Sequence, residues 1–246
     1  MIRANLRERV TPADIHLAAG LLARDGKGRD TGYYTAMAEA EGVDRVLSLP
    51  ELLPLLLATP SLDAPSAPLL LYVTVRNALR DFQIDDAALA DYLGALLLEF
   101  GMRDRANRVE AHDDDRRMHL VDLVADLRTA EGQRAFLLCA HIGNYSLWLA
   151  GCFPDYITAR NNRRGAPGFP YYDELGARGF RMAADHGLAR AMELDQVYSH
   201  AADLFGRLRV ALNRVSDRMF FPGVSSPDRL MRQVREEFRL SPDPSP

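Results

Sequence analysis

The sequence predicts an all-α fold, a compact bundle of roughly eight to ten helices around one buried central helix. Apolar residues recur at intervals of three and four along most of the 246 residues, as on the buried face of a helix. The central helix is expected over residues 135–153 (AFLLCAHIGNYSLWLAGCF), which are largely apolar and contain both cysteines and the only tryptophan. One stretch alone, residues 69–75, has strand-like composition, and no second strand is present to pair with it.

The first elements are placed by their caps. Thr11 precedes Pro12 at the first helical position and Asp14 in the first turn, an order that starts a helix. A second helix is expected over residues 31–41. Short helical turns follow over residues 43–58, where prolines interrupt an apolar run.

The domain organisation depends on a proline-rich stretch, residues 59–68, which is the clearest linker in the chain. It could set off residues 1–58 as a semi-independent amino-terminal helical segment. We favour a single all-helical domain over residues 1–240, because the first 58 residues alone bury too little apolar surface. Residues 241–246 (SPDPSP) are expected to form a disordered tail.

The middle of the chain is predicted to be helical. Residues 69–75 (LLLYVTV) are interpreted as a buried helix, because a lone strand has no ladder to join. Asp86 is a suitable cap for the next helix, and Gly101 stands where that helix should end. The helical period resumes over residues 120–127.

The stretch after the central helix, residues 154–170 (PDYITARNNRRGAPGFP), is predicted to be a long irregular loop because Asn, Arg, Gly and Pro dominate it. Loops of this length in compact domains are often functional. Two long helices are expected over residues 173–190 and 195–220, and a shorter amphipathic piece over residues 228–240.

Composition narrows the function classes. Hydrophobic residues at 48% and charged residues at 26% are typical of a soluble globular protein, and the net charge of -4 argues against nucleic-acid binding.

The charged amino terminus has no secretory signal, so a cytoplasmic location is expected. The central helix is about 28 Å long, close to a bilayer core, but the polar side chains near its middle argue against a membrane span. The preference for arginine over lysine indicates a GC-rich, bacterial genome.

The first candidate site is a polar stripe on the central helix. His141, Asn144, Tyr145 and Trp148 fall at i, i+3, i+4 and i+7, so they share one face and could line a ligand pocket between helices. The alternative is that each polar tip is hydrogen-bonded inside the core while the indole fills space.

The second candidate is the arginine-rich stretch that follows, with Arg160, Arg163 and Arg164. Guanidinium groups bind carboxylate or phosphate through two parallel hydrogen bonds. Combined with the first candidate, this suggests an enzyme in which His141 is the acid or base and the arginines hold an anionic substrate. That hypothesis requires His141 to open onto a cavity beside Tyr145 and at least one of these arginines.

The third candidate is a metal site. On a helix, His112, Asp115 and His119 would share one face and could hold a divalent cation. However, Asp122 and Asp126 continue that face, which is typical of a solvated helix surface, and no HExxH motif is present. Metal binding is kept as an alternative.

The leading hypothesis is therefore a non-catalytic protein that binds a small anionic ligand or a protein partner. Self-association of the chain into a homo-oligomer is kept as a further prediction. The cofactor is unknown, since the sequence contains no phosphate-binding glycine loop, dinucleotide fingerprint or GxSxG. The enzyme and the metal-binding protein are the alternatives.

Overall fold

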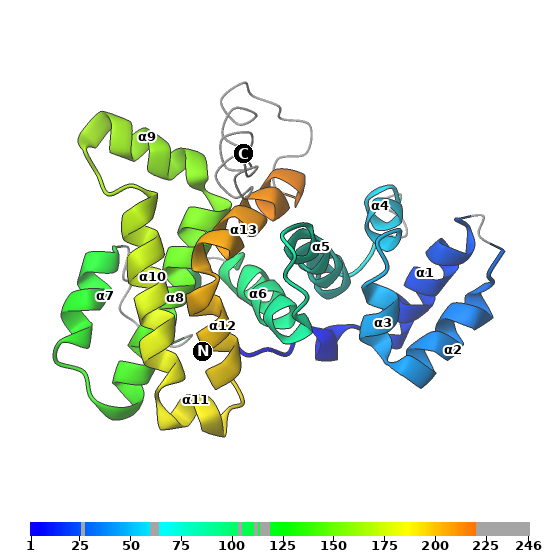
Figure 1. Cartoon of the computed structure of the whole chain (residues 1–246), viewed down its shortest axis with the longest axis horizontal. Coiled ribbons are helices and arrows are strands. Elements are labelled where there is room, and N and C mark those ends of the chain that lie inside the picture. Colours follow the sequence, from blue (N-terminus) through cyan, green and yellow to red (C-terminus); the bar gives the residue numbers. More distant parts are fainter. Residues whose placement is uncertain (26–27, 60–63, 103–104, 111–112, 114–118, 220–246) are drawn as a thin grey trace, which may run out of the picture.

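A computed structural model gives the structure of the chain, and it describes residues 1–25, 28–59, 64–102, 105–110, 113 and 119–219. Within these residues the protein consists of thirteen α-helices and two short 3-10 helices, without a strand. This confirms the predicted all-α bundle. The described helices outnumber the eight to ten expected, because residues 154–164 are helical and the stretches 173–190 and 195–220 each contain a break. Figure 1 shows the helices α7 to α10 at one end of the molecule and α1 to α4 at the other.

The first half of the chain contains α1 (Pro12–Ala23), α2 (Thr31–Glu41), α3 (Val43–Leu47), α4 (Leu52–Leu57), α5 (Ala67–Asp81) and α6 (Ala87–Phe100). The 3-10 helices are η1 (Arg7–Arg9) and η3 (Arg105–Asn107). The second half contains α7 (Leu120–Leu127), α8 (Gly132–Cys152), α9 (Pro154–Arg164), α10 (Phe169–Ala184), α11 (Gly187–Ala191), α12 (Asp195–Asp203) and α13 (Phe205–Met219).

Helix α8 is the predicted central helix. Every residue from Phe136 to Leu147 is buried, and α6, α7, α9, α10 and α13 all contact this helix. By length and composition α8 could cross a membrane, but 83% of its apolar window is buried inside the protein, as in the core helix of a globular protein. Its cysteines, Cys139 and Cys152, are both buried and free, as their spacing predicts.

Helices α8 and α10 approach closely because glycines lie at their contact. A Cβ atom on Gly179 of α10 would stand 2.8 Å from the carbonyl oxygen of Cys139. A Cβ on Gly143 of α8 would stand 2.6 Å from the ring of Phe180. Both are closer than real Cβ contacts, so the two helix backbones can take this separation only where the side chain is a hydrogen atom.

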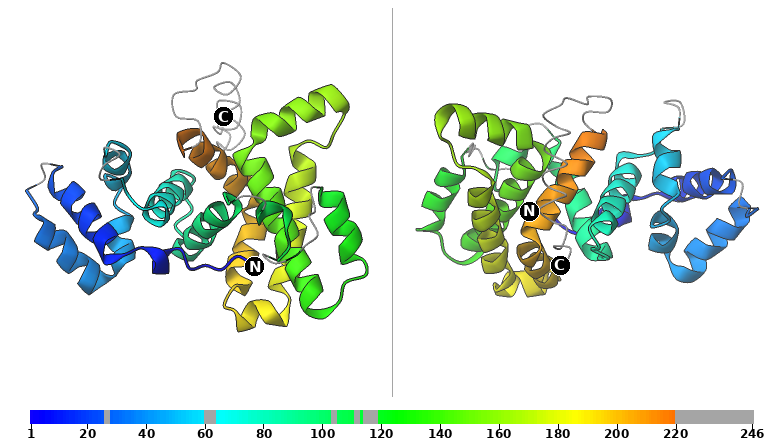
Figure 2. Two further views of the ribbon diagram at one scale, coloured as in Figure 1. Left: turned by 180° about the vertical axis from the view of Figure 1, so that it is seen from behind. Right: turned by 45° about the horizontal axis from the view of Figure 1, so that its top comes forward.

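The amino-terminal helices are joined to the rest of the protein through α5. The buried guanidinium of Arg76 donates to Asp85 (2.5 Å) and to the hydroxyl of Ser48 (3.1 Å), which follows α3. The hydroxyl of Tyr72, also on α5, donates to Asp44 of α3. These polar contacts fix α3 against α5, and Figure 2 shows α1 to α4 extending away from the other helices in both views.

The structure corrects the prediction for residues 154–170, which do not form a long irregular loop. Residues Pro154–Arg164 form α9, with proline at its first position and basic residues in its last turn. Gly165 ends the helix in the left-handed conformation (φ 60°), which glycine adopts without steric cost. These capping signals are present in the sequence, but the polar composition of the segment concealed them.

Smaller differences concern helix ends. The helix predicted over residues 173–190 begins earlier, at Phe169, and ends at Ala184, and the helix predicted over residues 195–220 is interrupted at Leu204. Helix α5 begins at Ala67, inside the stretch 59–68 predicted to be a linker. The amphipathic piece over residues 228–240 and the tail over residues 241–246 lie outside the described residues.

Replacing Gly179 by alanine should destabilise the protein by about 1–3 kcal/mol, because the added methyl group meets backbone atoms that cannot move away without separating α8 from α10. Gly20 of α1 is the matched control, since nothing lies within 4 Å of a Cβ there and Gly20→Ala should gain about 0.5–1 kcal/mol from helix propensity. Urea unfolding followed by circular dichroism measures both. A Gly179→Ala variant as stable as the wild type would contradict the close contact.

Candidate ligand-binding site

Some residues of the polar stripe of α8 lie in the core, and others lie on the wall of a cavity. His141 and Asn144 are 4% and 3% exposed and line no cavity described below, whereas Tyr145 lies on a cavity wall. Trp148 is half-buried and packs against the rings of Phe100 and Phe153. A helical stripe is wide enough that neighbouring residues on it face different helices.

Asn144 belongs to a polar contact inside the core. Its side-chain oxygen accepts a hydrogen bond from the hydroxyl of Tyr92 on α6 at 2.6 Å. The ring of Tyr92 meets that of Tyr198 on α12 edge to face, with 5.6 Å between centroids. Complete burial raises the pKa of Tyr92 well above its ordinary value, so the phenol stays neutral and remains a donor. Asn144 therefore connects α8 to α6.

His141 lies between aromatic rings. Phe100 is 5.7 Å away and Tyr145 is 6.0 Å away between centroids, and the imidazole forms a hydrogen bond with the backbone of Ala106. Its Nε2 atom is buried and has no hydrogen-bond partner among the described residues. Burial, followed by the positive charges of Arg105 and the amino terminus, lowers the pKa of His141 to about 3. The imidazole is therefore neutral in the folded protein.

A first hollow opens beside Tyr145, between α7, α8, α9 and α10, with a volume of about 310 Å³. Tyr145 and Leu149 of α8 form one wall, and Tyr171 and Tyr172 at the beginning of α10 form another. Arg160 of α9 also lines this hollow. We call this the tyrosine hollow.

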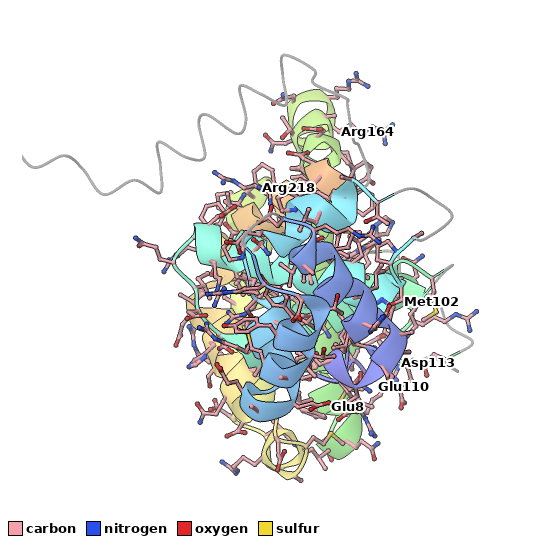
Figure 3. All side chains as sticks on the ribbon, turned by 90° about the vertical axis from the view of Figure 1, so that its right-hand side faces the viewer. Glu8, Met102, Glu110, Asp113, Arg164 and Arg218 are labelled. Carbon is pink, nitrogen blue, oxygen red and sulfur yellow. The ribbon has the colours of Figure 1, made fainter. Side chains whose placement is uncertain are left out.

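A second hollow, of about 370 Å³, lies along α9. Tyr156, Arg160, Arg163 and Arg164 line it, and they share one face of the helix because they lie at i, i+4, i+7 and i+8. His119, immediately before α7, lines the same hollow. We call this the arginine hollow, and Figure 3 shows Arg164 near the end of the projecting helix α9.

The two hollows adjoin each other, because His119 and Arg160 line both of them, and we call the pair the groove. The Arg160 guanidinium stands 5.4 Å from the centroid of the Tyr156 ring and donates to its hydroxyl at 3.2 Å. His119 precedes α7 without using its side chain as a cap, which leaves the imidazole available to the groove.

The electrostatics of the groove favour an anion. Within the described part of the chain, no carboxylate lines either hollow and none forms an ion pair with Arg160, Arg163 or Arg164. Burial raises the pKa of Tyr145 and of Tyr172 above the ordinary phenol value. Both phenols are therefore neutral donors that do not repel a negative ligand.

The structure thus brings together four of the predicted site residues, Tyr145, Arg160, Arg163 and Arg164. Sequence analysis did not identify the other tyrosines of the groove. Tyr156 stands four residues before Arg160, a spacing that becomes informative once α9 is known to be a helix. Tyr171 and Tyr172 offered no comparable signal, because their position depends on how α10 packs.

The predicted metal site is only partly described. His112 and Asp115 lie outside the described residues, and His119 belongs to the groove wall. Within the part of the chain that the structure describes, no group of three potential ligands is close enough to hold a metal ion.

Comparison with known proteins gives no match: no family model, characterised protein or solved structure is significantly similar to the chain. The groove must therefore be interpreted from its own chemistry.

His141 should make the protein sensitive to acid. The unfolded chain takes up a proton near pH 6.5, whereas the native imidazole, with its pKa lowered to about 3, does not. The stability of the wild type therefore falls as the pH drops below about 6.5, and this residue contributes a loss of about 2 kcal/mol between pH 7.5 and pH 5.

His141→Leu should remove this part of the pH dependence, whereas His16→Gln, at an exposed position on α1, should preserve it. Urea unfolding at the two pH values measures the difference. Equal losses of stability in the wild type and His141→Leu would show that the imidazole is not held neutral in the core.

Proposed function

We propose that this protein binds a small organic anion that carries a ring, and that the groove formed by the tyrosine and arginine hollows is its binding site. The observation that carries the proposal is that arginines lie on the groove wall while, among the residues that the structure describes, no carboxylate lines either hollow. A groove built for a cation or a neutral ligand would have no use for this excess of positive charge.

Solvation of a basic helix end explains only part of this arrangement. Arg163 and Arg164 occupy the last turn of α9, where the helix dipole favours a positive charge whatever its function. Arg160 lies further from that end and is placed beside tyrosines contributed by two other helices. Its position between the two hollows is what the binding proposal accounts for.

The groove supports binding more directly than catalysis. The enzyme hypothesis needed His141 on the cavity wall, but this side chain is 4% exposed and lines neither hollow. We therefore give His141 a structural role in the proposal. A protein partner, a homo-oligomer, a metal ion and a cytoplasmic location stay predictions from the sequence, independent of this site.

Ring-bearing anions should raise the melting temperature of the wild-type protein, because a ligand that binds only the folded state stabilises it. Benzoate, phenyl sulfate and phenyl phosphate are suitable probes, with neutral benzyl alcohol for comparison. At ten times the dissociation constant the expected stabilisation is about 1.4 kcal/mol, or about 3–5 °C.

Arg160→Ala should lose the shift, because it removes the guanidinium shared by both hollows. Arg178→Ala, which removes an exposed charge from the neighbouring helix α10, should keep it. The proposal fails if no anion shifts the wild type, or if Arg160→Ala and the wild type respond equally.

A further inference from the structure

The two hollows differ in chemistry, so a ligand that fills both of them must have two chemically different parts. The tyrosine hollow is walled mainly by apolar and aromatic groups, including Leu149, Pro167 and Tyr172. In the arginine hollow, Arg163 and Arg164 join Arg160. The groove therefore suits a molecule with a ring at one end and a negative group at the other.

The number of hydrogen-bond donors in the arginine hollow indicates which negative group the ligand carries. One guanidinium satisfies one carboxylate by a two-pronged contact. The arginine hollow offers three guanidinium groups and the imidazole of His119, more than a carboxylate with two oxygens can use. A phosphate monoester carries three terminal oxygens and a charge of about -1.5 to -2 at neutral pH, which matches this set.

The size of the groove excludes phosphate alone as a well-fitting ligand. Each hollow by itself, at about 310 Å³ and about 370 Å³, already reaches the lower limit of the roughly 300–1,000 Å³ found for small-molecule sites. The rings of Tyr171 and Tyr172, 5.5 Å apart and edge to face, offer two aromatic surfaces to a planar group.

We infer that the groove binds an aromatic ring that carries a phosphate monoester, an inference that rests on the proposed function. The ring lies in the tyrosine hollow and the phosphate in the arginine hollow, with Arg160 between them. A simple aryl phosphate and a nucleoside monophosphate share this chemistry.

Calorimetric titration at pH 7.5 tests the inference with phenyl phosphate, phenyl sulfate and inorganic phosphate. Phenyl sulfate has the same ring and a tetrahedral group with only one negative charge, and inorganic phosphate lacks the ring. Phenyl phosphate should bind about tenfold more tightly than either. Adenosine monophosphate distinguishes the two sources. If it binds more tightly than phenyl phosphate, the ligand of the groove is a nucleotide, and if it binds more weakly, the ligand is a simple aryl ester.

Substitutions at two exposed positions, Arg163 and Tyr171, test the arginine hollow and the tyrosine hollow separately without disturbing the core. Arg163→Ala should reduce the preference for phenyl phosphate over phenyl sulfate, and Arg178→Ala should preserve it. Tyr171→Ala should weaken the binding of phenyl phosphate towards the affinity of inorganic phosphate. Tyr33→Ala, at a similarly exposed position on α2, should not.

The possible failures can be told apart. Equal affinities for phenyl sulfate and phenyl phosphate, both lost in Arg160→Ala, would overturn the phosphate inference and leave the proposed function standing. Inorganic phosphate binding as tightly as phenyl phosphate would overturn the assignment of the ring. If neither aromatic anion binds, the proposed function is itself refuted.

Discussion

The close packing of α10 on α8 is the constraint on which the rest of the structure depends. Gly143 and Gly179 allow the two backbones to approach, and Phe180 fills the space that a side chain on Gly143 would need. The same pair of helices supplies two of the walls of the tyrosine hollow, through Tyr145 on α8 and Tyr172 on α10. The core contact therefore sets the width of the site.

Helix α9 contributes the charge of the groove and little of the core. It buries only Pro154 and Ile157, and its remaining residues are partly or fully exposed. An anion held between α9, His119 and the tyrosines of α10 would connect elements that otherwise have few contacts with one another. Ligand binding and the stability of this end of the protein are expected to be coupled for that reason.

Much of the fold could be predicted from periodicity and caps. The central helix and the helical interpretation of residues 69–75 are both confirmed, because a continuous apolar pattern fixes burial before any tertiary contact is known. Helix α9 was missed because its composition is polar, although Pro154 and Gly165 mark its two ends. In this segment the polar composition is typical of a loop, whereas the capping residues are typical of a helix.

The site could be predicted only in part. Placing Tyr145 and the arginines near one another required only that α8 be followed closely by a basic segment. Separating Tyr145 from His141, which share a helical stripe, required the positions of Phe100 and Ala106, and these belong to other elements. The contribution of α10 depends on the glycine contact. The small residues Gly176, Gly179 and Ala183 recur at helical spacing and predict a close backbone approach, but that spacing does not say which helix they meet.

Native-state hydrogen exchange followed by mass spectrometry tests the central claim most directly. If α8 and α10 form one tightly packed unit, their amides exchange only when the whole protein unfolds, so both helices share the highest opening free energy in the chain. Faster exchange in α10 than in α8, through an opening that leaves α8 protected, would contradict the account.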